Sequence, residues 1–301
     1  MNLRHAATVW GQLLLAAMSL VAEPVLAQRV FVFSSSDGVQ YKQALAGIQK
    51  HGLPVESFQV TGDNDAALAS VLARTGRDSV IVTLGGRAST LVANAATGTT
   101  TVNCMVLGDD NGKPPVNTQV VPLEVPIEVQ MQWLKRLLPK VRLVGLLYDP
   151  AQNERRATET VAALTRVGFQ TVLEPVPTPN ALPAALNRLN NNVDVLFALP
   201  DTTVFAREHS RSLLLFSFRN FIPLAGPNEG WVRAGALYAV EWDYADLGRH
   251  CVALGLRQLA GNRTPPPSPA MTRAIVNLRS AEQLRINWDA EILRTVERVV
   301  E

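Results

Sequence analysis

The chain has 301 residues, with 28 lysines and arginines against 26 aspartates and glutamates, so its formal net charge is only +2. Basic and acidic residues are interspersed, and no basic stripe indicates nucleic-acid binding. The hydrophobic share of 47% is typical of a globular α/β protein. Composition therefore predicts a folded protein and argues against a nucleic-acid partner.

The first 27 residues have the three-part layout of a secretory signal peptide. Arg4 lies in a short basic segment, Ala6–Ala22 is mostly apolar, and Val25–Ala27 places small residues where a signal peptidase reads them. A membrane anchor is the alternative, but a span needs about 20 apolar residues, and Gln12 and Glu23 interrupt this run. We expect cleavage after Ala27 and export to the periplasm. No cysteine follows the cleavage position, so a lipid-anchored form is not expected.

Strands and helices alternate through the next part of the chain. Apolar runs predict strands, and apolar residues at helical spacing predict helices, with Asp63 as a helix N-cap. The expected strands are Arg29–Phe33, Val55–Val60, Ser79–Leu84 and Thr101–Leu107, and the expected helices are Val39–His51, Asp63–Arg74 and Ala88–Ala96. This alternation predicts a parallel sheet with helices on both faces.

The segment Asp109–Val121 lacks periodicity and contains Asn-Gly and Pro-Pro, so it is the best candidate for a linker. The alternation then resumes. Expected helices are Pro126–Leu138, Glu154–Val167 and Ala181–Leu189, and expected strands are Arg142–Tyr148, Gln170–Glu174, Val193–Leu199, Phe221–Ala225 and Ala234–Val240. The pattern predicts a second doubly wound sheet and two lobes in series, with one large sheet as the alternative.

The chain has two cysteines, Cys104 and Cys251. They could pair in an oxidising compartment, but each lies in an apolar run, which favours two free buried thiols. The four histidines are scattered, and no metal-ligand spacing or phosphate-binding loop is present. We therefore expect neither a cofactor nor a metal.

Ligands in open α/β sheets bind outside the carboxyl ends of the strands. Polar and aromatic residues follow the predicted strands in both halves of the chain. The candidate ligand-binding residues are Ser35, Ser36, Asp37, Thr83, Gly85 and Arg87 in lobe one, Tyr148, Asp149, Asp201, Thr202, Glu229 and Trp231 in lobe two, and Glu241 and Trp242 where the chain crosses between lobes.

These residue types suit a zwitterion such as an amino acid. The serines and glycines precede helix N-termini, where backbone N–H groups and the helix dipole favour a carboxylate. Asp149, Asp201 and Glu241 could bind an ammonium group, and the tryptophans could pack an apolar portion. Purely structural interpretations compete: Asp201 can cap a helix, residues 34–37 can form a plain turn, and Trp242 can pack in a hinge.

No histidine lies near a predicted strand end, so no base–nucleophile pair can be assembled. A carboxylate pair such as Asp149 with Asp201 could do acid–base chemistry, but their spacing in the sequence does not establish that they lie close enough. We expect a protein that is not an enzyme.

Several stretches together resemble the substrate-binding proteins of bacterial ABC transporters, in the branch with tryptophan/tyrosine-type binding proteins. The matching stretches are Val144–Pro150, Val193–Asp201, Ile222–Leu224, Ala234–Leu237, Asp246–Arg249 and Val276–Leu278 with Ala281. Asp201-Thr202 stands where many relatives have Asp-Asn, and Ala151–Glu154 replaces a usual Glu-Asn-Ser cluster, so the chain resembles a divergent member.

The resemblance implies a type I-like periplasmic flytrap, with lobe one at 28–122 plus about 242–264 and lobe two at 123–241 plus about 265–301. It also implies a small-molecule ligand held between the lobes and an inner-membrane permease that receives it. A monomer is expected. The alternatives are a periplasmic sensor coupled to a membrane receptor and, less in keeping with the residues, an α/β enzyme.

Overall fold

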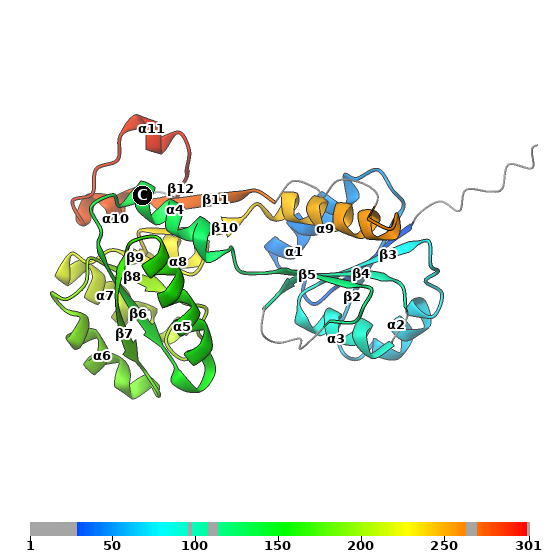
Figure 1. Ribbon diagram of the computed structural model, residues 1–301, viewed down its shortest axis with the longest axis horizontal. Helices are drawn as coiled ribbons and strands as arrows, with labels where there is room; N and C mark the ends of the chain where they lie inside the picture. Colours follow the sequence, from blue (N-terminus) through cyan, green and yellow to red (C-terminus); the bar gives the residue numbers. More distant parts are fainter. Residues whose placement is uncertain (1–28, 96–97, 108–113, 263–269, 300–301) are drawn as a thin grey trace, which may run out of the picture.

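The computed structural model describes residues 29–95, 98–107, 114–262 and 270–299. The expected signal peptide and the first part of the predicted linker lie outside the described residues. Two mostly parallel sheets with flanking helices form two lobes (Figure 1). The two-lobed α/β architecture predicted from the sequence is confirmed.

Sheet one has the strand order β2-β1-β3-β4-β5, and every neighbouring pair is parallel. Long apolar runs form its central strands, which are buried because helices cover both faces. The elements are β1 (Arg29–Ser34), α1 (Val39–Gln49), β2 (Val55–Gln59), α2 (Asp65–Leu72), β3 (Ser79–Leu84), α3 (Gly86–Ala95), β4 (Thr100–Val106) and β5 (Thr118–Pro122).

Sheet two has the order β12-β11-β10-β9-β8-β6-β7, in which only the β10–β11 pair is antiparallel. Its elements are α4 (Ile127–Leu137), β6 (Leu143–Tyr148), α5 (Pro150–Arg166), β7 (Gln170–Pro175), η1 (Pro179–Ala181), α6 (Leu182–Leu189), β8 (Val195–Ala198), η2 (Arg207–His209), α7 (Ser210–Asn220), β9 (Leu224–Ala225), α8 (Glu229–Ala234), β10 (Tyr238–Trp242), β11 (Thr272–Asn277), α10 (Leu278–Gln283), α11 (Ala290–Leu293) and β12 (Glu297–Val299).

The following four sequence predictions are wrong in detail. The linker prediction fails at its end, because residues 118–122 form β5 at the edge of sheet one. The expected strand Phe221–Ala225 shrinks to the two residues of β9, and the expected strand Ala234–Val240 begins only at Tyr238 because α8 runs to Ala234. Helix α2 begins after Asn64 instead of Asp63.

The chain passes between the sheets at residues 123–126, again after β10, and back before β11 (Figure 1). Helix α9 (Tyr244–Leu259) follows the second crossing and packs on α1, β3 and β4 of sheet one. The α1–α9 crossing is close, because a Cβ added at Gly47 would overlap the carbonyl of Ala245, and one at Gly248 would overlap that of Ala44.

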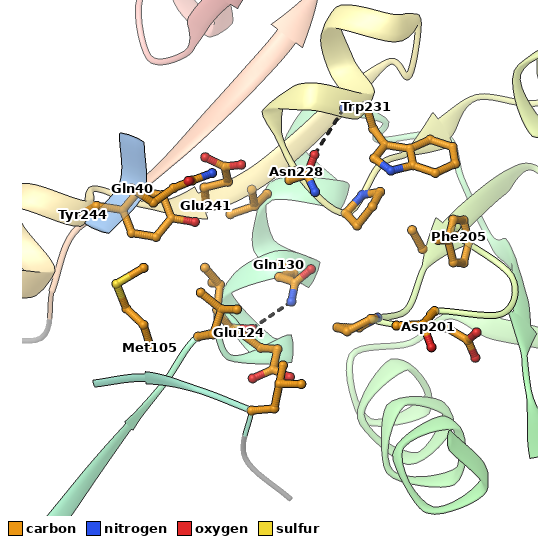
Figure 2. Close-up of a pocket in the computed structure, with 18 of the residues that line it drawn as sticks. Gln40, Met105, Glu124, Gln130, Asp201, Phe205, Asn228, Trp231, Glu241 and Tyr244 are labelled. Carbon is orange, nitrogen blue, oxygen red and sulfur yellow. Dashed lines mark hydrogen bonds between the residues drawn. The ribbon is translucent and has the colours of Figure 1, made fainter. Parts of the chain in front are cut away.

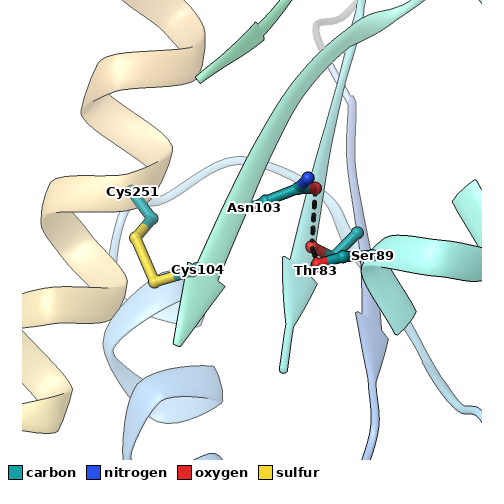
Figure 3. Close-up of a disulfide and its surroundings, with 5 residues drawn as sticks. All are labelled: Thr83, Ser89, Asn103, Cys104 and Cys251. Carbon is teal, nitrogen blue, oxygen red and sulfur yellow. Dashed lines mark hydrogen bonds between the residues drawn. A yellow bond between two sulfur atoms is a disulfide. The ribbon is translucent and has the colours of Figure 1, made fainter. Parts of the chain in front are cut away.

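A disulfide between Cys104 on β4 and Cys251 on α9 fastens this helix to sheet one (Figure 3). The two Cα atoms are 6.6 Å apart, and 147 positions separate the residues along the chain. The prediction of two free thiols was therefore wrong. Apolar surroundings indicate burial, but they do not distinguish one buried cysteine from two that face each other across a helix–sheet interface. No helix among the described residues is long and apolar enough to cross a membrane.

Candidate ligand-binding site

A cavity of about 550 Å³ lies between the two sheets (Figure 2). Residues of both sheets and of the crossings line it. They are Gln40, Tyr41, Met105 and Leu107 from lobe one, Leu123, Glu124 and Val125 at the first crossing, Gln130 from α4, Ala198, Pro200, Asp201, Thr202, Phe205, Ala206, Pro227, Asn228 and Trp231 from the strand ends and helices of lobe two, Val240 and Glu241 from β10, and Tyr244 from the start of α9.

The cavity opens at the carboxyl ends of strands, where parallel sheets present their ligand sites. Leu107 follows β4, Pro200 follows β8, and Pro227 follows β9. Met105 has a φ of 58° at a register shift between β4 and β5. Such a bulge redirects a side chain, and Figure 2 shows Met105 directed at the cavity.

Four aromatic side chains form much of the wall: Tyr41, Phe205, Trp231 and Tyr244. Phe205 and Trp231 meet edge to face, with ring centroids 5.7 Å apart and planes at 71°. Burial raises the pKa of Tyr244 and of Tyr41 above the ordinary value. Both hydroxyl groups therefore stay protonated and can donate hydrogen bonds at neutral pH.

Two amide side chains point into the middle of the site. The side-chain oxygen of Asn228 accepts a hydrogen bond from the backbone N–H of Trp231 at 3.2 Å, which caps α8. Gln130 donates its Nε2 to the carbonyl oxygen of Val125 at 2.7 Å. Each amide uses one end within the protein, so Nδ2 of Asn228 and Oε1 of Gln130 are the ends that can serve a ligand (Figure 2).

Asp201 lines the cavity, but the protein itself occupies both of its carboxylate oxygens. Oδ1 accepts the backbone N–H groups of Thr203 and Val204, each at 2.8 Å. Oδ2 accepts the backbone N–H of Asp149 at 2.7 Å and Nδ2 of Asn153 at 2.8 Å. The buried carboxylate thus ties the end of β6 to the end of β8. Asp201 therefore caps the backbone that follows it, as the structural interpretation of the sequence allowed, although residues 202–204 form a turn and not a helix.

Asp149 is buried and does not line the cavity. It caps α5 by accepting the N–H of Ala151 at 2.9 Å, and it also accepts Oγ1 of Thr203 at 2.6 Å and Nε2 of Gln152 at 3.0 Å. The hydrogen bond from Thr203, followed by those from Ala151 and Gln152, holds the pKa of Asp149 below its ordinary value despite burial. This cap also explains why α5 starts at Pro150 and not at Glu154, where the sequence placed it.

Glu241 faces the cavity from within β10, not from beyond the end of a strand. Its Oε1 accepts the backbone N–H of Glu229 at 2.7 Å, and its Oε2 lies 3.4 Å from Arg273 on the antiparallel neighbour β11. Burial is the largest influence and raises the pKa of Glu241 above the ordinary value, against the lowering effects of these two partners. Glu229 itself pairs with Arg233 and Arg273 and does not line the cavity.

The lobe-one candidates are engaged within their own lobe, and none of them lines the cavity. Ser35 Oγ accepts the N–H of Ala88 at 2.9 Å, and Ser36 Oγ accepts that of Gly38 at 3.1 Å. Asp37 pairs with Lys42, and Arg87 donates a hydrogen bond to the carbonyl of Thr61. The hydroxyl of Thr83 is hydrogen-bonded to Ser89 and Asn103 (Figure 3). Gly85 makes the positive-φ turn after β3.

Two further candidates belong to hydrophobic cores. Tyr148 packs in lobe two, and Trp242 packs with lobe one. Of the ligand-binding residues predicted from the sequence, the cavity brings together Asp201, Thr202, Trp231 and Glu241.

Sequence reasoning missed Gln40, Tyr41, Met105, Glu124, Gln130 and Phe205 as lining residues. Position could have indicated Gln40 and Tyr41, because they form the first turn of the helix that follows the first strand. The bulge that turns Met105 inward has no signal in an apolar run.

Two α/β lobes with a cavity between their strand ends define a class of protein that holds a small molecule at a lobe interface. The profile of the family described as ABC transporter substrate binding protein matches residues 91–300, and the chain belongs to this family. The family consists of extracytoplasmic binding proteins and not of enzymes. No curated protein matches this sequence.

Solved structures share the fold at low identity. The ligand-free, open structure of a substrate-binding protein with adhesive properties from Clostridium difficile has a TM-score of 0.71 at 18% identity, over 91% of this chain and 99% of that one. An ABC domain from Streptococcus pneumoniae in complex with L-Trp has a TM-score of 0.57 at 19% identity, over 90% and 100% of the chains. A sugar-binding protein of a Bacillus halodurans ABC transporter has 0.55 at 12% identity, over 85% and 99%.

Proposed function

We propose that this protein captures a small polar molecule between its two lobes and delivers it to an ABC-type permease in the inner membrane. The observation that carries the proposal is the cavity of about 550 Å³ lined from both sheets. Small-molecule sites are clefts of this size, mostly apolar with a few placed polar groups. Membership in the substrate-binding family supports delivery to a transporter.

The cavity wall suits a ligand with an apolar or aromatic body and a polar end, such as an amino acid or a related compound. Aromatic rings from both lobes supply apolar contact area, and the amides of Asn228 and Gln130 supply hydrogen bonds. The L-Trp complex of the Streptococcus pneumoniae domain supports such a ligand only through a shared fold.

We further propose lobe boundaries at 28–122 plus about 242–264 and at 123–241 plus about 265–301. The sheet order supports this division, since β10 and β11 belong to sheet two while α9 packs on sheet one. Ligand capture would close the lobes by a hinge motion at the crossings. The mature protein would be a periplasmic monomer that begins at Gln28. It would not be catalytic, because protein donors already occupy the carboxylates of Asp149 and Asp201.

Native mass spectrometry of protein purified without denaturation tests the proposal, because a captured solute should appear as an added mass. A thermal-shift screen of amino acids and related compounds then measures binding. A ligand at 100 times its Kd stabilises the folded state by about 2.7 kcal/mol. The proposal would be contradicted if the mass spectrum showed no added mass and no compound in the screen raised the melting temperature.

Two exposed apolar residues of lobe one offer a matched pair of variants. Leu107, 37% exposed, lines the cavity, whereas Val39, 68% exposed, does not. Leu107→Trp should weaken binding of the captured solute at least tenfold by filling part of the cavity, and Val39→Trp should leave binding unchanged. Equal effects of the two substitutions would locate the ligand elsewhere.

A further inference from the structure

The charged side chains that line the cavity are all acidic. Glu124, Asp201 and Glu241 contribute carboxylates, and no lysine, arginine or histidine is among the described residues of the lining. A ligand carboxylate would therefore meet no cationic side chain in the described part of the cavity wall. An ammonium group would meet up to three carboxylates, so the usefulness of each one depends on its existing partners.

Two of the three carboxylates have partners of their own in the protein. Asp201 accepts four hydrogen bonds from the protein. Glu124 pairs with Arg156 at 3.1 Å, and Arg156 also donates to the carbonyl of Pro200 at 3.2 Å. Asp201 therefore needs no ligand to complete its surroundings, and Glu124 has a full cationic partner in Arg156, although its buried Oε1 lacks a hydrogen bond.

Glu241 is compensated only in part. The guanidinium of Arg273 serves Glu241 and Glu229 through one nitrogen, at 3.4 Å to each, and Glu297 through another, at 2.7 Å. Arg233 is the second cation of the cluster and pairs with Glu229. The three carboxylates Glu229, Glu241 and Glu297 thus share two guanidinium groups, which leaves one negative charge. Among the three, only Glu241 lines the cavity.

Aromatic rings lie beside this carboxylate. Tyr244 and Glu241 adjoin each other at the second crossing, with Gln40 next to them in Figure 2. An aromatic face attracts a cation, and the attraction grows as water is excluded. The surplus negative charge and the ring therefore favour the same kind of group at the same end of the cavity.

We propose that the cavity selects a cationic amine with an apolar or aromatic body, whose ammonium group binds Glu241, and that it does not require a carboxylate on the ligand. This inference rests on the proposed function and narrows its ligand class. One feature opposes it: the first turn of α1 reaches the cavity at Gln40 and Tyr41, and backbone N–H groups there favour an anion. A zwitterion is therefore the competing ligand.

Isothermal titration of the wild-type protein with four matched indole compounds decides between a cationic amine and a zwitterion as the ligand. Tryptamine carries the amine alone, L-tryptophan the amine and the carboxylate, indole-3-acetate the carboxylate alone, and tryptophol neither charge. Tryptamine should bind at least tenfold more tightly than each of the other three. A parallel series of phenethylamine, L-phenylalanine, phenylacetate and 2-phenylethanol covers the case in which an indole ring does not fit.

Equal or tighter binding of the zwitterion, the acid or the alcohol would overturn the inference and leave the proposed function standing. Binding of neither amine would also overturn it. The proposed function fails separately, if native mass spectrometry and the wider screen find no ligand at all.

A pair of variants tests the role of Glu241. Glu241→Gln keeps the shape and should lower the affinity for the bound amine at least tenfold while leaving that for the matched alcohol unchanged. Glu159→Gln removes an exposed carboxylate of α5 that pairs with Arg155, away from this cluster and from the cavity, and should retain amine binding. The assignment would be contradicted if Glu241→Gln lost affinity for the amine and the alcohol alike, or lost affinity for neither. The selectivity of the wild-type protein remains a test should Glu241→Gln not fold.

Discussion

The two lobes are stabilised at the cavity by different means. In lobe one, a disulfide and a close crossing of α1 and α9 fix the return helix on the sheet. In lobe two, the carboxylates of Asp149 and Asp201 join neighbouring strand ends by hydrogen bonds to backbone and side-chain donors. Lobe one therefore depends on covalent and steric fit, and lobe two on ionised carboxylates. The first should respond to reductant, and the second to acid.

The largest effect should come from the disulfide. The double variant Cys104→Ala with Cys251→Ala should lose about 4 kcal/mol of unfolding free energy, because the bond closes a loop across 147 positions. Urea unfolding measures the loss of unfolding free energy. Hydrogen exchange shows whether the loss falls on β3 of lobe one, as expected, or on β8 of lobe two. Reductant should shift the wild-type protein and not the variant. A loss that falls on β8 alone would contradict the assignment to lobe one.

The next effect concerns the helix crossing. Gly47→Ala should cost about 3 kcal/mol, since the new methyl group overlaps the carbonyl of Ala245 and the helices must separate. Gly76→Ala is the control in the same lobe, because a Cβ there meets nothing within 4 Å. Thermal unfolding of the two variants tests the difference, and similar midpoints would show that the crossing is not close.

In lobe two, Asp201→Asn should cost about 2 kcal/mol, because an amide nitrogen cannot accept the hydrogen bonds that one carboxylate oxygen now accepts. Asp37→Asn, at an exposed pair with Lys42, should change the unfolding free energy very little. Urea unfolding of both variants provides the comparison. A small cost at Asp201 would mean that the carboxylate is free to serve a ligand.

The smallest effect is a pH dependence. The pKa of Asp149 lies below its ordinary value of 3.8 in the folded protein, mainly because Thr203 donates to it. The folded state then binds fewer protons than the unfolded state, so this stabilisation is present above about pH 4 and is lost as pH falls through the folded pKa. Asp149→Asn, which keeps a capping side chain, should lose about 1 kcal/mol at pH 7 and much less at pH 3.

Glu241 should behave in the opposite way. Burial raises its pKa, so the folded state binds more protons than the unfolded state just above the ordinary value. Its contribution to stability therefore falls as pH rises through that window. Chemical unfolding of Asp149→Asn and Glu241→Gln between pH 3 and 7 should give slopes that depart from the wild type in opposite directions. Slopes that change in the same direction would contradict one of the two shifts.

Much of the fold was predictable because its central strands are apolar runs of about six residues between amphipathic helices. Ser79–Leu84 and Leu143–Tyr148 appear almost where the sequence placed them. Prediction failed where elements are short. Strand β9 has two residues and α8 has six, too few for a periodic signal to separate them from the surrounding apolar residues.

The site was less predictable, because a polar residue at a strand end has two possible partners. Asp201 and Ser35 follow strands as ligand-binding residues do, yet their oxygens accept backbone N–H groups, from the following turn for Asp201 and from α3 for Ser35. A sequence shows the acceptor but not which donor is nearest. The aromatic residue Tyr41 had the opposite problem, since it lies at helical spacing with other apolar residues, and such a pattern assigns a residue to the core and not to a cavity wall.

Hydrogen exchange with and without the co-purified solute tests most directly whether the ligand lies between the lobes. The account predicts simultaneous protection at the start of α1, around Gln40 and Tyr41, and in lobe two around Asp201–Phe205 and Asn228–Trp231. Protection confined to one lobe, or centred on the smaller cavity of about 130 Å³ between Ser89 and Thr118, would contradict it.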